Sequence, residues 1–122
     1  MTRRHAEIAG GGFAGLTAAI LLAQRGWSVR VHEVAPEPRA FGAGIFLWEN
    51  GLEVLRQIGV YDAVMANAFE AKQFNDLRAD GEVIFSKSLP IPQGSRMVTM
   101  TRQDLYAPIL AAARQAGIDI ET

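Results

Sequence analysis

The sequence of 122 residues has no cysteine, no long apolar run and no excess of basic residues. Without cysteine there can be no disulfide framework, no thiolate metal site and no cysteine nucleophile. A net charge of −1 argues against binding to nucleic acid, because no basic surplus is available to neutralise phosphates. The sequence contains no run of about 18 apolar residues, so no membrane span is indicated. An expected strand begins at residue 5 and leaves no room for a signal peptide, so we expect a cytoplasmic protein.

An apolar content of 49% predicts one packed folded unit and not a disordered chain. The most informative stretch is residues 8–15, where Gly10, Gly12 and Gly15 occupy the glycine positions of a G-x-G-x-x-G pattern. The first glycine allows a tight turn after a strand, the second lets a pyrophosphate approach the backbone, and the third lets a helix pack closely on the sheet. That helix directs free N–H groups and the positive end of its dipole at the phosphates.

The residues that flank the glycines support this interpretation. A short strand is expected over residues 5–9, and a helix over residues 13–25 has its apolar side chains at helical spacing. A second strand over residues 29–32 ends at Glu33, about 20 residues beyond the glycines, where a carboxylate can accept hydrogen bonds from an adenosine ribose. We therefore predict a dinucleotide-binding βαβ unit. A βαβ turn without a ligand is the alternative.

A turn-rich loop and a second cluster of glycines follow the second strand. Two prolines exclude regular structure over residues 34–39, and Arg39 is the only cation of this loop. Its guanidinium could pair with a phosphate or lie free in solvent, and spacing alone does not decide between them. Gly42 and Gly44 let the backbone approach a ligand. The apolar residues 46–48 are either core or a wall beside a flat ring system.

The rest of the chain predicts further helices and a hairpin that does not belong in a parallel nucleotide-binding sheet. We also expect Glu7 and Arg30, at similar heights on neighbouring strands, to form an ion pair. The remaining expected elements are a helix over 51–58 capped by Asn50, a helix over 61–67, a hairpin of strands 74–78 and 83–87 around Asp80 and Gly81, a helix over 101–116 capped by Thr101 and kinked at Pro108, and a strand over 118–121.

These elements predict an α/β fold, in which a Rossmann-type parallel sheet is joined to the start of an antiparallel sheet. Residues 1–70 would form the dinucleotide-binding segment, and residues 71–98 a hairpin that contributes to a substrate domain. Residues 99–122 would return to the first sheet as a helix and a strand. The expected strands complete neither sheet. We therefore expect a missing C-terminal portion or partner chain, and no activity from the 122 residues alone.

Four motifs, taken in order, resemble the N-terminal third of the single-component flavoprotein aromatic hydroxylases, the family typified by para-hydroxybenzoate hydroxylase. The motifs are the glycine turn of residues 10–15, Glu33, Arg39 with residues 42–45, and residues 100–102 with Leu105. Residues 9–19 and 39–52 are most similar to a member of the family that oxygenates and opens a hydroxypyridine ring.

This resemblance implies an FAD site. Glu33 would hold the adenosine ribose, Arg39 would lie along the phosphates, and Arg102 would reach FAD from the start of its helix. The residues implied to bind FAD are Gly10, Gly12, Ala14, Gly15, Glu33, Val34, Arg39, Gly44, Ile45 and Arg102, and those implied on the substrate side are Phe46 and Leu47. The resemblance implies no metal, and it assigns no catalytic side chain within this sequence.

By the same resemblance, NADH or NADPH would reduce FAD, and the reduced flavin would take up O2 as a C4a-hydroperoxide that hydroxylates a small aromatic ring of pyridine type. Two alternatives remain open. An NAD-binding dehydrogenase domain would use the same glycine turn, and Glu33 would then favour NAD over NADP. A nucleotide-binding module without its own activity would explain why the family's later Asp-Gly and Gly-Asp motifs are absent here.

Overall fold

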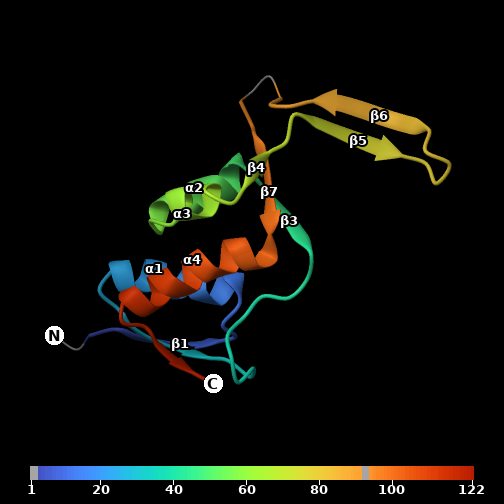
Figure 1. The fold of residues 1–122 in the computed structure, drawn as a ribbon. Helices are drawn as coiled ribbons and strands as arrows, with labels where there is room; N and C mark the ends of the chain where they lie inside the picture. The colour runs from blue at the N-terminus through green and yellow to red at the C-terminus, as the bar shows by residue number, and fades with distance from the viewer. Residues whose placement is uncertain (1–2, 92–93) are drawn as a thin grey trace.

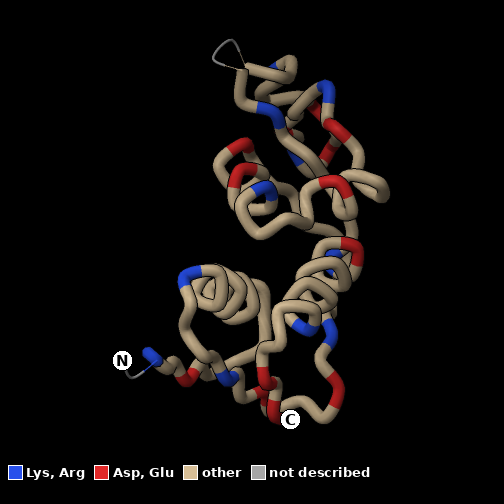
Figure 2. The backbone as a smooth tube through the Cα atoms, turned by 90° about the vertical axis from the view of Figure 1, so that its left-hand side faces the viewer, with Lys and Arg blue, Asp and Glu red and all other residues tan. Residues whose placement is uncertain are grey.

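The computed structural model describes residues 3–91 and 94–122, and their strands and helices form the predicted α/β fold (Figure 1). The elements in chain order are β1 (His5–Ala9), α1 (Phe13–Gln24), β2 (Ser28–His32), β3 (Gly44–Trp48), α2 (Glu49–Gln57), α3 (Tyr61–Met65), β4 (Phe69–Glu70), β5 (Gln73–Leu77), β6 (Val83–Ser88), β7 (Met97–Thr101), α4 (Arg102–Gln115) and β8 (Asp119–Glu121). Lys and Arg are interspersed with Asp and Glu along the chain and do not gather on one element (Figure 2).

The first sheet is parallel, with the strand order β1-β2-β8. β8 comes from the far end of the sequence and pairs with β2, which places Val31 opposite Ile120. Both α1 and α4 cover the same face of this sheet (Figure 1). Their apolar faces pack against the strands, and Leu16, Val31 and Ile109 are among the most deeply buried side chains. The third parallel strand that a Rossmann-type sheet needs is therefore supplied by β8.

The other face of this sheet is polar, and the predicted Glu7–Arg30 ion pair does not form there. Glu7 and Arg30 are register partners on β1 and β2. The Glu7 carboxylate lies instead 2.8 Å from Nε2 of His5 and 2.6 Å from Nε2 of His32. Arg30 donates instead to Asp119 of β8 over 2.8 Å and lies 3.2 Å from the carboxylate of Glu121 on the same strand. The prediction was wrong because it did not include β8 beside Arg30.

A second sheet is antiparallel, with the strand order β3-β7-β4, and the sequence predicted none of these strands. β7 runs through its centre, so that Thr99 pairs with Phe46 on one side and with Phe69 on the other. Val98 is fully buried between this sheet and the helices. The sequence missed β3, β4 and β7 because each pairs only with strands distant in the chain, so no local turn signal marks them.

The hairpin of β5 and β6 is confirmed and forms a separate two-stranded sheet. It projects away from the helices (Figure 1), and all of its strand residues are exposed. Its register shifts by one residue between Asp76 and Leu77. Two prolines within residues 89–94 predict a connecting loop between this hairpin and β7, and residues 92 and 93 of it lie outside the described part of the chain.

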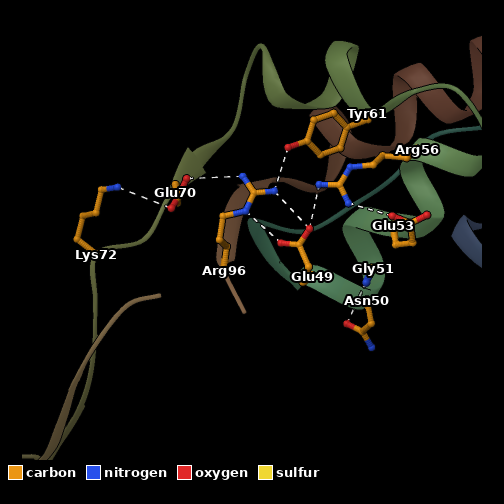
Figure 3. Close-up of polar contacts among 9 residues, drawn as sticks. All are labelled: Glu49, Asn50, Gly51, Glu53, Arg56, Tyr61, Glu70, Lys72 and Arg96. Carbon is orange, nitrogen blue, oxygen red and sulfur yellow. Dashed lines mark hydrogen bonds and ion pairs between the residues drawn. The ribbon is translucent and has the colours of Figure 1, made fainter. Parts of the chain in front are cut away.

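The helix after β3 begins earlier than predicted. α2 starts at Glu49 with Trp48 as its N-cap, and the Asn50 side chain accepts a hydrogen bond from the Gly51 N–H over 2.9 Å, inside the first turn. Glu49, in that turn, forms ion pairs with the guanidinium of Arg96, 3.0 Å away, and with that of Arg56, 2.9 Å away (Figure 3). Asn50 is therefore not the cap, because it lies inside the helix, after the ion-paired Glu49.

The helix after β7 starts as predicted. The Thr101 side chain accepts a hydrogen bond from the Asp104 N–H over 3.0 Å, and α4 is a continuous helix through Pro108. No helix in the described residues has both the length and the apolar character that crossing a membrane requires.

Candidate functional site

The glycine turn joins β1 to α1, and each of its glycines is in a different situation. Gly10 has a φ of +97°, a conformation that other residues rarely adopt. A Cβ atom on Gly15 would lie 1.9 Å from the carbonyl oxygen of Gly10, so helix and turn touch through backbone alone. A Cβ atom on Gly12 would meet no heavy atom within 4 Å. The turn is thus closed at Gly15 and open at Gly12.

The N-terminus of α1 has backbone donors available. Gly12 is its N-cap, no side chain caps the helix, and no acidic residue occupies its first turn. Both Gly12 and Ala14 are exposed. The first N–H groups of a helix have no intrahelical acceptor, and together with the helix dipole they form a binding site for an anion.

Glu33 lies directly beside this turn. One carboxylate oxygen accepts a hydrogen bond from the Gly11 N–H over 2.7 Å, and the other accepts from the Ala35 N–H over 2.9 Å. These bonds from Ala35 and Gly11 lower the pKa of Glu33, so it is ionised at neutral pH. A carboxylate has about four lone-pair sites, which leaves Glu33 capacity to accept from further hydroxyl groups. Its neighbour Val34 is almost fully exposed.

A second group of predicted residues meets at the start of α4. The N–H of Arg102 donates to the carbonyl of Ala43 over 3.3 Å. A Cβ atom on Gly42 would lie 2.9 Å from Cδ of Arg102, so the arginine stem lies against the glycine loop. Arg39 is exposed, and its guanidinium lies 4.4 Å from the centre of the Phe41 ring. The structure therefore joins Arg102 to the glycine loop but gives Arg39 no contact with Arg102.

An open pocket of about 730 Å³ lies on one face of the second sheet. Its walls include Gly44 and Ile45 from β3, and Phe46 and Phe69 stand on either side of Thr99. Phe46 and Phe69 are 52% and 65% exposed, so the pocket presents two large apolar residues to solvent. This face offers a mainly apolar surface that suits a flat ring.

Leu47 does not belong to this pocket. Successive side chains of a strand point to opposite faces, and Leu47 turns away from Phe46. It lines a separate apolar hollow of about 530 Å³ with Phe13 and Leu105, on the side of the helices. Leu47 also packs against Gly51 of α2, where an added Cβ would lie 3.3 Å from Leu47 Cδ2. Leu47 therefore lies apart from this pocket, and its place on the substrate side stays a prediction.

Tyr106 makes a contact with the glycine turn that the sequence did not predict. Its hydroxyl donates a hydrogen bond to the carbonyl oxygen of Gly11, and its side chain is 2% exposed. Its ring meets that of Phe13 edge to face, with 5.8 Å between the centroids. A tyrosine on the apolar face of a helix was the available signal, because a buried hydroxyl requires a partner.

The ion-pair network of Figure 3 is a structural feature next to the second sheet. Arg96, just before β7, donates to Glu49 over 3.0 Å and to the hydroxyl of Tyr61 over 3.0 Å. The guanidinium groups of Arg96 and Arg56 lower the pKa of Glu49. The network ties the start of β7 to α2 and α3. In the described part of the chain, no group of three or more His, Asp or Glu side chains is arranged to hold a metal ion.

Known proteins share both the sequence and the fold of this chain. Residues 4–122 match the family model described as FAD binding domain. The chain is 42% identical over 122 residues to a 2-heptyl-3-hydroxy-4(1H)-quinolone synthase of Mycobacteroides abscessus, covering 100% of this chain and 32% of that protein. It is 34% identical over 124 residues to the FAD-dependent monooxygenase OpS4 of Beauveria bassiana, covering 97% of this chain and 29% of that protein.

Among solved structures, the tetrameric form of 2-methyl-3-hydroxypyridine-5-carboxylic acid oxygenase is 42% identical, with a TM-score of 0.89 over 99% of this chain and 32% of that chain. This chain therefore belongs to the FAD binding domain family. The predicted resemblance is confirmed, and FAD, not NAD, is the dinucleotide of the family. The chain spans about a third of the length of these relatives.

The contrast between Gly15 and Gly12 gives a direct test of the turn. Gly15→Ala must push α1 away from β1, and we expect a loss of about 3 kcal/mol in the free energy of unfolding, the upper end for overpacking. Gly12→Ala is the matched control, with an expected loss below about 1 kcal/mol. The measurement is thermal unfolding of the complete protein, which includes any further segment beyond these 122 residues, in its FAD-free form. Equal stabilities of the two variants would contradict the assigned roles.

Proposed function

We propose that this chain is the FAD-binding first part of an NAD(P)H-dependent monooxygenase that hydroxylates a small, already hydroxylated aromatic ring. The observation that carries the proposal is the open approach to Gly12 at the start of α1, next to the ionised carboxylate of Glu33. Free backbone N–H groups and a carboxylate acceptor, placed side by side, match the pyrophosphate and the ribose of a dinucleotide.

The donor set fits FAD in three parts. The glycine turn and the start of α1 would bind the pyrophosphate, Glu33 would accept from the adenosine ribose, and the glycine loop before β3 would approach the flavin. Arg39 and Arg102 would supply positive charge for the phosphates. The residues proposed to hold FAD are Gly10, Gly12, Ala14, Gly15, Glu33, Val34, Arg39, Gly44, Ile45 and Arg102.

The pocket on the second sheet is the proposed place for the reacting ring. Phe46 would face the substrate, and the apolar walls of the pocket would orient a flat ring and help to exclude water. A nitrogen-containing ring of pyridine type is favoured, because two relatives that are 42% identical over nearly all of this chain are named for a hydroxypyridine carboxylate and a hydroxyquinolone. When bound, FAD would accept electrons from NADH or NADPH and would activate O2.

The complete enzyme needs more than these 122 residues. The relatives are about three times as long, and the hairpin of β5 and β6 has no covering layer among the described residues. We propose that a further C-terminal portion completes the substrate pocket and adds contacts to FAD. Residues 1–70, 71–98 and 99–122 would then contribute, in turn, the first FAD-binding segment, a hairpin of the substrate domain and the return to the first sheet.

Binding of FAD through Gly12 can be tested by adding bulk at the open position. We expect the complete protein to purify with FAD or to bind it when added, and Gly12→Val to lose it, because a branched side chain would occupy the approach of the pyrophosphate. Flavin absorbance of the purified proteins measures retention, and thermal unfolding of the FAD-free forms controls for folding. Tight binding of NAD by a folded protein that ignores FAD would overturn the proposal.

The role of Glu33 predicts a loss of affinity and not of folding. Hydrogen bonds to a charged group contribute about 1.5–3 kcal/mol each, so Glu33→Ala should weaken FAD binding about tenfold or more. Quenching of flavin fluorescence during titration measures the dissociation constant. Glu37→Ala, an exposed carboxylate in the same loop, is the matched control and should bind FAD as the wild type does. Unchanged affinity of Glu33→Ala would reject the ribose assignment.

Residues 1–122 alone should not hydroxylate any substrate. The described sheets leave open edges, and an uncovered edge favours aggregation over a stable monomer. The assay is NADH and NADPH oxidation by the isolated chain, with added FAD and a panel of hydroxypyridines and hydroxybenzoates, followed by product analysis. A monomeric, cooperatively unfolding chain that forms hydroxylated product would show that no further segment is needed.

A further inference from the structure

Tyr106 links two parts of the chain that are 95 positions apart, and no motif accounts for it. It lies on the buried face of α4, and its hydroxyl donates to the carbonyl oxygen of Gly11 in the glycine turn. Edge-to-face packing on Phe13, in the first turn of α1, fixes the position of the ring. The hydroxyl therefore reaches the glycine turn from a rigid, packed position.

Gly11 is held from both sides. Its N–H donates to the carboxylate of Glu33 over 2.7 Å, and its carbonyl accepts from Tyr106. Gly11 is itself buried. Because its own N–H is used by Glu33, it is not free to bind a phosphate. The next N–H in the turn, that of Gly12, is the first that remains available.

The orientation of the Gly12 N–H follows from the geometry of the peptide bond. The carbonyl of Gly11 and the N–H of Gly12 belong to one peptide group, and the cis peptide bond of the described chain lies elsewhere, at Leu89–Pro90. In a planar trans peptide, the C=O and the N–H point in opposite directions. The carbonyl points inward to the buried Tyr106, so the N–H points outward, on the exposed side of the turn where Gly12 has open space.

We propose that Tyr106 is a positioning residue for the pyrophosphate of FAD, which holds the Gly11 carbonyl so that the Gly12 N–H faces the phosphates. The inference rests on the proposed function, because it takes FAD as the ligand of the turn. Tyr106 itself touches neither the cofactor nor the substrate. Its hydroxyl also polarises the peptide group, which makes the N–H at the other end a stronger donor.

The protonation state of Tyr106 is consistent with this role. Burial raises the pKa of Tyr106, and the negative charge of Glu33 raises it further. The hydroxyl therefore keeps its proton at neutral pH and remains a donor to Gly11. Phenylalanine would retain the packing on Phe13 while removing only this donor, which makes the contribution of the hydrogen bond measurable.

The test compares Tyr106→Phe with Tyr61→Phe in the complete protein. Tyr61 is the other tyrosine of this sequence, and its hydroxyl accepts from Arg96 over 3.0 Å, next to α2 and α3. We expect Tyr106→Phe to weaken the binding of FAD and of ADP about three- to tenfold, the range for one neutral hydrogen bond, and Tyr61→Phe to leave both unchanged. The ³¹P NMR signals of bound FAD should shift in Tyr106→Phe alone.

Adenosine, which lacks the pyrophosphate, separates orientation from folding. We expect its affinity to be the same in Tyr106→Phe and in the wild type, because the lost contact acts on the phosphate donor. An equal loss for adenosine and ADP, as general loosening of the fold would cause, overturns the inference. If the wild type binds FAD and Tyr106→Phe binds it with the same affinity and the same ³¹P spectrum, the inference about Tyr106 is overturned while the proposed function stands. A folded wild type that does not bind FAD overturns both.

Discussion

The close approach of α1 to β1 is the constraint on which the nucleotide-binding part depends. Gly15 touches the carbonyl of Gly10 so closely that no side chain fits between them. This contact sets the start of α1 at the end of β1 and leaves its first N–H groups uncapped, beside Glu33, which directly follows the neighbouring strand β2. A larger residue at Gly15 would displace the helix, and the backbone donors would no longer converge on one point.

α4 is the second organising element, because it connects the glycine turn to the second sheet. Its first residue, Arg102, lies against the glycine loop that precedes β3, and one turn further on, Tyr106 reaches Gly11. The strand β7 leads directly into this helix, and its Thr101 caps it. Two surfaces that bind different ends of a flavin cofactor in the proposed function are thus held in register by one strand-helix unit.

Much of the candidate site could be predicted because its signals are local. The spacing of Gly10, Gly12 and Gly15 reflects steric needs that operate within one turn, and Glu33 follows at a distance set by one helix and one strand. The hairpin at Asp80 and the cap at Thr101 are equally local. Their structures agree with the prediction because short-range hydrogen bonds decide them.

The errors share a different physical origin. Glu7 and Arg30 are neighbours as expected, but Arg30 pairs with carboxylates on β8, and the Glu7 carboxylate contacts two histidines. Asn50 is not the cap, because the helix begins one residue earlier at Glu49, which pairs with Arg96, far along the chain. Asp119 and Arg96 are both distant in sequence from the side chains with which they pair, and spacing along the chain does not predict such pairs.

The sequence by itself therefore determined the α/β class, the glycine turn and its acidic partner, because these follow from backbone sterics and spacing over a few tens of residues. Only the tertiary structure decided which strand completes the parallel sheet, that Leu47 faces the helices while Phe46 faces the pocket, and that Tyr106 holds Gly11. Those features depend on which distant side chains share one face, and packing of the whole chain settles that choice.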